Sequence, residues 1–224
     1  MTRTVNDFKR PDSALVAQYR EVAGCYSASC VFADVRHRRG VMHSSIKPIL
    51  SGKLVGPALA VKLSPGDLVD PLDALMLAQS GDVIVVDANG ETETSVWGGL
   101  MGGLCLQRGV KGAIVDGAVR DIDELRDMEF LLFSRSVTPR GTHTMYSGRK
   151  DELQINVPIS CGGVVVHPGD MIVGDENGVT VIPRADVESV LELAREQAQR
   201  EEATRQQIAK GKTVEQLLDE FGRI

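Results

Sequence analysis

Glycine, arginine and aspartate residues between Trp97 and Asp121 have the types and spacing of a site for a small anion. Four glycines lie within six residues, at positions 98, 99, 102 and 103, and Arg120-Asp121 ends the segment. Glycine lets a backbone approach a ligand closely and present bare N–H groups to it. Arginine has the planar fork that holds a carboxylate, and aspartate offers the hard oxygen that Mg²⁺ or Mn²⁺ prefers. These residues predict a site for a small carboxylated substrate.

The same segment indicates a helix, a turn and a strand, in that order. We expect a helix over 101–108, a turn at Gly109 and Gly112, and a strand over 113–116. The first glycines would then lie at a helix start, where unpaired N–H groups and the helix dipole favour an anion. Asp116 precedes Gly117 and is interpreted as a turn residue rather than a ligand.

Short apolar runs separated by glycines, with helices between them, predict an α/β or α+β domain around this segment. Two of the predicted strands, over 171–174 and 179–182, are expected to form a β-hairpin with its turn at Glu176-Asn177-Gly178. The other predicted strands cover 56–62, 83–87, 131–133 and 164–166, and the other predicted helices cover 12–24, 73–79 and 122–127. We interpret residues 1–185 as one catalytic domain.

Residues 186–224 differ from the rest and predict a helical arm. Positions 186–210 hold no glycine or proline, and apolar residues with helical spacing occur only in their first half. The stretch 195–207 has almost no apolar face. Such a helix either projects into solvent or reaches a neighbouring subunit, and we favour the neighbour because a solvated helix gains little from packing.

Composition narrows the class of protein. The 224 residues are 42% hydrophobic, which suits a globular core, and carry a net charge of −6, which argues against a nucleic-acid partner. No apolar run approaches the roughly 20 residues that cross a membrane. The cysteines show no metal-site spacing and are expected to be free thiols in a reducing cytoplasm. They are Cys25, Cys30, Cys105 and Cys161.

Four motifs together resemble one known family. GDVIVVD, WGGLMGGL, RGVKGAIVDGAVRD and GDENGVTVIP are similar to the regulator of ribonuclease activity A family. That family also contains the 4-hydroxy-4-methyl-2-oxoglutarate (HMG) and 4-carboxy-4-hydroxy-2-oxoadipate (CHA) aldolases. The resemblance covers roughly residues 45–185. It implies a layered α/β sandwich of the swivelling phosphohistidine-domain type with an extended C-terminal helix, assembled as a homotrimer or homohexamer.

The aldolase branch implies a chemistry as well. Its members use Mg²⁺ or Mn²⁺ to cleave a 4-hydroxy-2-oxo dicarboxylate to pyruvate through a metal-stabilised enolate, and they often decarboxylate oxaloacetate. The developing oxyanion needs positive charge, which a divalent ion and a guanidinium supply. Since no lysine is an obvious Schiff-base candidate, the residues favour this route over an iminium.

The resemblance also assigns roles to residues. It places the substrate carboxylate and carbonyl on Arg120 and makes Asp121 the metal ligand. The backbone N–H groups that would hold the substrate belong to Gly98, Gly99, Leu100 and Met101.

Two further segments of the resemblance are less closely matched. The aldolases take a glutamate from a neighbour's C-terminal helix, for which Glu201 or Glu202 is the better match here. The segment at Asp70–Asp73 departs from the family pattern and, if it faces the site, would alter which distal substrate group is tolerated. His143 lies in a basic, glycine-containing stretch that we interpret as a surface loop.

Two alternatives to the aldolase stay open. One is a non-catalytic regulator that binds a ribonuclease or another protein. The other is a lyase of the same fold that acts on a different hydroxy or oxo acid, which the unusual Asp70–Asp73 segment suggests. The long C-terminal helix favours an enzyme, because the regulator branch lacks one.

Overall fold

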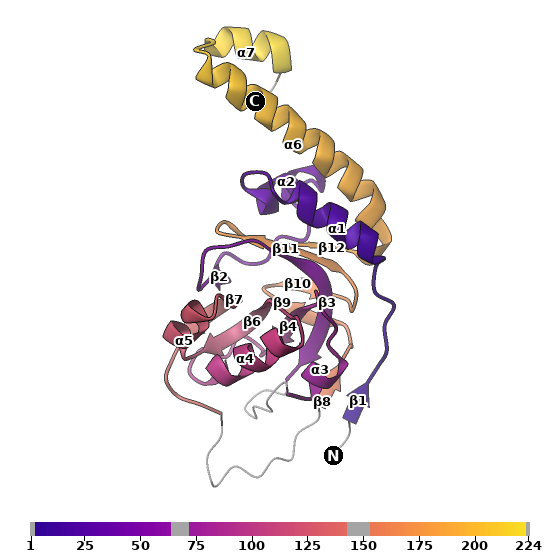
Figure 1. The fold of residues 1–224 in the computed structure, drawn as a ribbon, viewed down its shortest axis with the longest axis vertical. Coiled ribbons are helices and arrows are strands. Elements are labelled where there is room, and N and C mark those ends of the chain that lie inside the picture. The colour runs from indigo at the N-terminus through magenta and orange to yellow at the C-terminus, as the bar shows by residue number, and fades with distance from the viewer. Residues whose placement is uncertain (1–2, 64–71, 143–152, 223–224) are drawn as a thin grey trace.

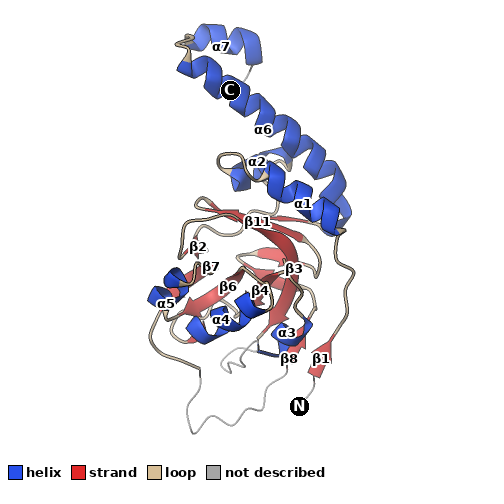
Figure 2. Ribbon diagram, viewed as in Figure 1, coloured by secondary structure: helices blue, strands red, loops and turns tan. Residues whose placement is uncertain are grey.

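The computed structural model describes residues 3–63, 72–142 and 153–222 and has a mixed α/β fold (Figure 1, Figure 2). Its strands are β1 (Arg3–Val5), β2 (Lys47–Pro48), β3 (Leu54–Lys62), β4 (Val83–Asp87), β5 (Ser95–Trp97), β6 (Gly112–Val119), β7 (Leu131–Val137), β8 (Leu153–Ile155), β9 (Ile159–Cys161), β10 (Val164–Val166), β11 (Met171–Asp175) and β12 (Gly178–Ile182). Its helices are α1 (Ser13–Val22), α2 (Ala28–Val35), α3 (Leu72–Leu77), α4 (Gly99–Gln107), α5 (Ile122–Asp127), α6 (Val187–Ala209) and α7 (Val214–Phe221), with a 3-10 turn at Arg184–Asp186.

Four parallel strands form the centre of the large sheet, in the order β3-β4-β6-β7. Every residue of β4 and β6 is buried, as expected for parallel strands covered on both faces. Because these strands run the same way, their carboxyl ends meet at one edge of the sheet. Ligands of parallel α/β sheets commonly bind at that edge.

Helices α3, α4 and α5 cover one face of these strands (Figure 1). On the far side of the fold the β11–β12 hairpin continues from the first half of β3, and α1, α2 and α6 cover it. Asp175 pairs with Gly178 across the hairpin, which confirms the predicted turn. The two helix groups therefore lie on different parts of the molecule, with the sheet between them.

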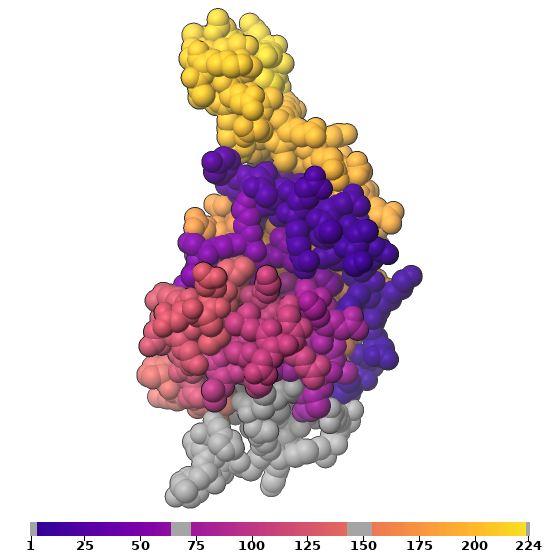
Figure 3. Space-filling model, viewed as in Figure 1, coloured from indigo at the N-terminus to yellow at the C-terminus, as the bar shows by residue number. Residues whose placement is uncertain are grey.

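Helix α6 changes character along its length, as the sequence predicts. Its buried residues include Val187, Leu191 and Ala194, which pack with α1 and α2, and the Tyr19 hydroxyl donates to the Val187 carbonyl at 2.8 Å. The C-terminal end of α6 and α7 project from the body (Figure 3), although Arg205 of α6 still lies over the Tyr26 ring. Burial raises the pKa of Tyr19 far above its ordinary value, so this hydroxyl stays a hydrogen-bond donor.

The expected elements are confirmed, with ends that differ by a few residues. The helix predicted over 12–24 spans Ser13–Val22, and the strand predicted over 131–133 extends to Val137. Helices α2 and α7 and the short strands β1, β2, β5, β8 and β9 were not predicted. Within the described ranges, no helix is both long and apolar enough to span a bilayer.

Candidate active site at the start of helix α4

The predicted glycine segment lies at the beginning of α4. Gly98 is the N-cap, in extended backbone, and the N–H of Gly102 closes the first turn on the Gly98 carbonyl at 3.2 Å. The first N–H groups of a helix have no partner within it. Those of Gly99, Leu100 and Met101 therefore face outward from the helix start, where the positive end of the dipole also lies.

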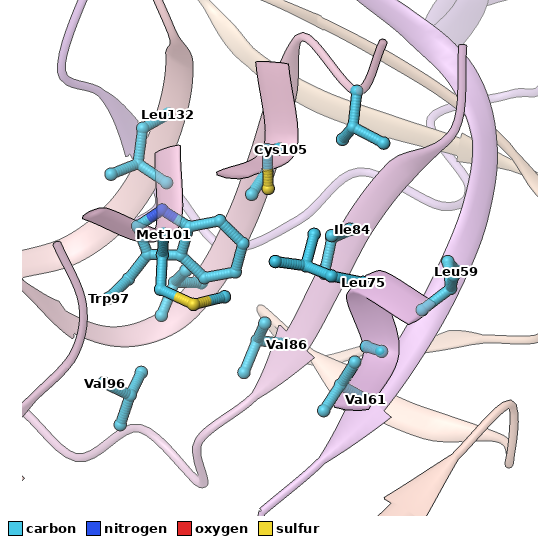
Figure 4. Close-up of a cluster of buried hydrophobic side chains, with 14 of the residues drawn as sticks. Leu59, Val61, Leu75, Ile84, Val86, Val96, Trp97, Met101, Cys105 and Leu132 are labelled. Carbon is cyan, nitrogen blue, oxygen red and sulfur yellow. The ribbon is translucent and has the colours of Figure 1, made fainter. Parts of the chain in front are cut away.

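The side chains on either side of the glycines are held by the core. Trp97 is buried and stacks on Phe130 with ring centroids 5.9 Å apart, and Met101 packs in the same apolar cluster (Figure 4). Leu100 points the other way and is 80% exposed. The side chain of Met101 is thus buried, and the substrate-binding role of its backbone N–H stays a prediction.

Arg120 and Asp121 directly follow β6 and reach this helix start. The Arg120 N–H donates to the Trp97 carbonyl at 2.9 Å, which fixes the end of β6 beside the end of β5. Asp121 has φ 54°, in the left-handed region, and is the N-cap of α5. Its side chain does not cap α5 but accepts a hydrogen bond from the Gly99 N–H at 3.1 Å. A non-glycine residue in this conformation is often found at functional sites.

The Arg120 guanidinium lies beside the same carboxylate. Its Nε is 3.5 Å from Asp121 Oδ2, and the two side chains are 46% and 41% exposed. An ion pair this open to solvent adds little stability. It places a cation, a carboxylate and an open helix turn together at the carboxyl edge of the parallel strands.

The missing side chains of Gly98 and Gly99 make room for the protein's own carboxylates. A Cβ added to Gly98 would lie 2.4 Å from Asp121 Oδ2, and one added to Gly99 would collide with the carboxylate of Glu124. Glu124 was not predicted from the sequence. Its position, three residues after Asp121 in the first turn of α5, was the available signal.

Asp116 was wrongly predicted to be a turn residue. It lies inside β6 and is buried, and its carboxylate accepts from Arg135 Nε at 2.5 Å and from the Gly162 N–H at 2.6 Å. Arg135 also donates to Ser45 Oγ at 2.7 Å. Asp116 therefore ties β6 to β7 and to the β9–β10 turn, and its surroundings indicate a structural role.

The cysteines do not contribute a thiolate to the site. Cys105 lies in α4, where burial raises its pKa to about 12. Burial, with Asp116 and Asp87 nearby, raises the pKa of Cys161 well above its ordinary value. Both thiols stay protonated and pack as small apolar side chains, as predicted. All four cysteines are free.

Glu201 and Glu202 lie on α6, in the helix group on the far side of the sheet from α4 and α5 (Figure 1). Glu201 accepts from Arg205 at 2.7 Å and from Gln197 at 3.0 Å, and Glu202 accepts from Gln206 at 3.2 Å. A single chain does not bring either glutamate to Arg120. Their proposed role as acids supplied by a neighbouring subunit stays a prediction.

The remaining predicted residues lie near the limits of the described ranges or outside them. Asp73 is in the first turn of α3, whereas Asp70 and His143 lie outside the described residues. Across residues 3–63, 72–142 and 153–222, no three His, Cys, Asp or Glu side chains gather as a metal-binding group. The predicted role of Asp121 as a metal ligand stays a prediction.

Comparisons with known proteins agree with this architecture. A family model described as RraA-like, Aldolase/RraA, matches residues 13–181. A Halalkalibacterium halodurans protein that carries the provisional name 4-hydroxy-4-methyl-2-oxoglutarate aldolase is 41% identical over 167 residues. That alignment covers 74% of this chain and 77% of the relative.

Two crystal structures resemble the fold closely. One is of an uncharacterised protein from Pseudomonas syringae, with a TM-score of 0.79 and 27% identity over 95% of this chain and 96% of the other. The second is Streptomyces coelicolor RraAS2, described as an unusual member of the RNase ES inhibitor RraA protein family. Its TM-score is 0.74 and its identity 28%, over 88% of this chain and 100% of the other.

Proposed function

The chain belongs to the RraA-like family, and on that premise we propose that it is a divalent-metal-dependent lyase that forms pyruvate. Its substrate would be a 4-hydroxy-2-oxo acid of the HMG or CHA type, with oxaloacetate as a second substrate. The relative named as an HMG aldolase supports this reading. The observation that carries it is the meeting of Arg120, the Asp121 carboxylate and the open first turn of α4.

The residues at the site fit a divalent ion. Asp121 Oδ2 is held by the Gly99 N–H, while Oδ1 makes no hydrogen bond or ion pair to the described residues. Mg²⁺ typically takes one or two protein carboxylates and keeps several waters, so Asp121 is sufficient as its anchor. When bound, Mg²⁺ or Mn²⁺ supplies the Lewis-acid charge that offsets negative charge on a carbonyl oxygen.

The chain's own groups would bind and orient the substrate. The C1 carboxylate would take the N–H groups of Leu100 and Met101, which lie at the positive end of α4. The Arg120 guanidinium would donate to the C2 carbonyl oxygen. Its planar, positively charged fork would be in place before the negative charge of the oxyanion develops.

The reaction that this arrangement favours is a retro-aldol cleavage. A base removes the proton of the C4 hydroxyl, C4 becomes a carbonyl, and the C3–C4 bond breaks. The electron pair of that bond forms the C2–C3 double bond of the pyruvate enolate, whose oxyanion lies at Arg120. C3 then takes up a proton. Decarboxylation of oxaloacetate gives the same enolate with loss of CO₂, so one site would serve both substrates.

We further propose that the protein assembles with itself as a trimer or hexamer. The end of α6 and α7 project from the body (Figure 3), and this supports the proposal because many of their side chains are charged and exposed and a neighbouring subunit could cover them. Glu201 or Glu202 would then complete a neighbour's site. Mixing two inactive variants, Asp121→Ala and Glu201→Ala/Glu202→Ala, should restore part of the activity if the acid crosses between subunits. No recovery in co-refolded mixtures would contradict the crossing.

A regulator of a ribonuclease is the second candidate, and the likeness to Streptomyces coelicolor RraAS2 favours it. The experiment that separates the candidates is a substrate screen. Purified protein is given HMG, CHA or oxaloacetate with Mg²⁺ or Mn²⁺, and pyruvate is followed with lactate dehydrogenase and NADH. We expect release that EDTA abolishes. Metal binding without turnover of any of the three would point to a lyase of another substrate, and no metal binding would point to the regulator.

A further inference from the structure

Glu124 lies against the same backbone that would bind the substrate. A Cβ built on Gly99 would overlap the Glu124 carboxylate and Cδ, and would lie 3.0 Å from its Cγ. The end of this side chain therefore folds back from α5 over the first turn of α4. Glycine at position 99 leaves the space that this carboxylate fills.

The carboxylate has no partner that explains its place. Glu124 is exposed, and its carboxylate makes no hydrogen bond or ion pair to the described residues, although its backbone carbonyl accepts from the Met128 N–H at 3.1 Å. It occupies the third position of α5, from which a glutamate often reaches back to its own N-cap. Instead it lies beside the N-terminus of α4, where the helix dipole attracts negative charge.

We propose that Glu124 is a specificity-determining residue whose carboxylate lies beside the anion position of the free site and repels a substrate carboxylate that binds there. The inference rests on the proposed function, because it concerns the same N–H groups at the start of α4. A ligand carboxylate that binds the N–H groups of Leu100 and Met101 must approach Gly99, and Glu124 has to rotate away as it does. Its long, exposed side chain makes that rotation easy.

The negative charge of Glu124 affects which ligands bind at the start of α4. An anion that binds at the start of α4 is attracted by the free N–H groups there but is repelled by the carboxylates of Glu124 and Asp121. Arg120 or a divalent ion can offset that repulsion. Removing the Glu124 charge should therefore tighten the binding of carboxylate ligands. The effect of one charge near a helix terminus corresponds to a two- to fivefold change in affinity, roughly.

The test is calorimetric titration of oxalate, a stable analogue of the pyruvate enolate, into the Mg²⁺-loaded protein. The variants are Glu124→Gln and the control Asp123→Asn. Asp123 is exposed on the same turn of α5 and its replacement removes the same charge, but its carboxylate does not lie on Gly99. Titration of Mn²⁺ alone into each protein shows whether metal affinity changes.

We expect Glu124→Gln to bind oxalate two- to fivefold more tightly, roughly, with Asp123→Asn and Mn²⁺ affinity unchanged. Weaker or equal oxalate binding in Glu124→Gln would overturn the inference, as would an equal gain in Asp123→Asn. A large loss of Mn²⁺ affinity would also overturn it, because Glu124 would then be a metal ligand. The predicted gain in a protein that releases no pyruvate would contradict the proposed function alone.

Discussion

Replacing Gly98 by alanine tests whether the glycine at the helix start holds the Asp121 carboxylate in place. Gly98 has extended backbone, φ −153° and ψ −171°, which alanine also adopts, so the fold should tolerate the change. The new Cβ would lie 2.4 Å from Asp121 Oδ2 and 3.2 Å from Arg120 Cγ. Both functional side chains would have to move.

The required movement can be estimated from these distances. An ordinary van der Waals contact begins at 3.4 Å, so Oδ2 must retreat by about 1 Å. Its hydrogen bond to the Gly99 N–H, now 3.1 Å, would then be lost. A displacement of about 1 Å in a reacting arrangement can cost about 10²-fold in rate. We expect kcat/KM for pyruvate release to fall by that order.

The assay is metal-dependent pyruvate release, with a thermal melt to check folding. Gly103→Ala is the matched control, because it lies in the same helix and nothing lies within 4 Å of its added Cβ. That variant should keep its activity and melt at the same or a higher temperature. Wild-type activity in Gly98→Ala, at full Mg²⁺ and Mn²⁺ occupancy, would refute the link between Gly98 and the position of Asp121.

Three further predictions concern other contacts. Arg120→Lys keeps the charge but loses the planar fork, so turnover should fall by about 10²-fold or more with an unchanged melt, and a wild-type rate would make Arg120 structural. Arg135→Ala removes one partner of buried Asp116, and urea unfolding should show a loss of roughly 1–3 kcal/mol, while an unchanged midpoint would contradict that role. Burial raises the pKa of Asp175, but hydrogen bonds from Ser29 and Asn177 outweigh it and leave this pKa below its ordinary value. A carboxyl group whose pKa is lower in the folded than in the unfolded state stabilises the fold at pH values above its unfolded pKa, and this contribution is lost as the pH falls. The difference in unfolding free energy between wild type and Ser29→Ala should therefore shrink as the pH falls below about 4. A difference that stays constant with pH would contradict this assignment.

The central strands could be predicted because their sequences leave little choice. Residues 83–86 and 113–115 are continuous apolar runs, and such runs form strands buried on both faces. Other strands could not be predicted because their residues are polar or too few. Ser134 to Ser136 continue β7 although they lack an apolar pattern, because they pair with β6. The three-residue strands carry too short a pattern to detect.

The candidate site was predictable only in part. Arg120, Asp121 and the glycines are recognisable because their order along the chain is itself the motif. The role of Asp116 was missed because its partners are distant in sequence, at Arg135 and Gly162. The contact of Glu124 with Gly99 joins two helix starts that periodicity does not relate to one another. Helix α7 was missed although its capping box, formed by Thr213 and Gln216, is a signal in the local sequence.

The measurement that tests the central claim most directly is pyruvate release by wild type and Asp121→Ala across a titration of Mn²⁺. The proposed lyase predicts that wild-type activity rises with Mn²⁺ to a plateau, and that Asp121→Ala neither binds Mn²⁺ tightly nor gains activity from it. Equal Mn²⁺-dependent rates in the two proteins would contradict the claim that Asp121 anchors a catalytic metal at the start of α4.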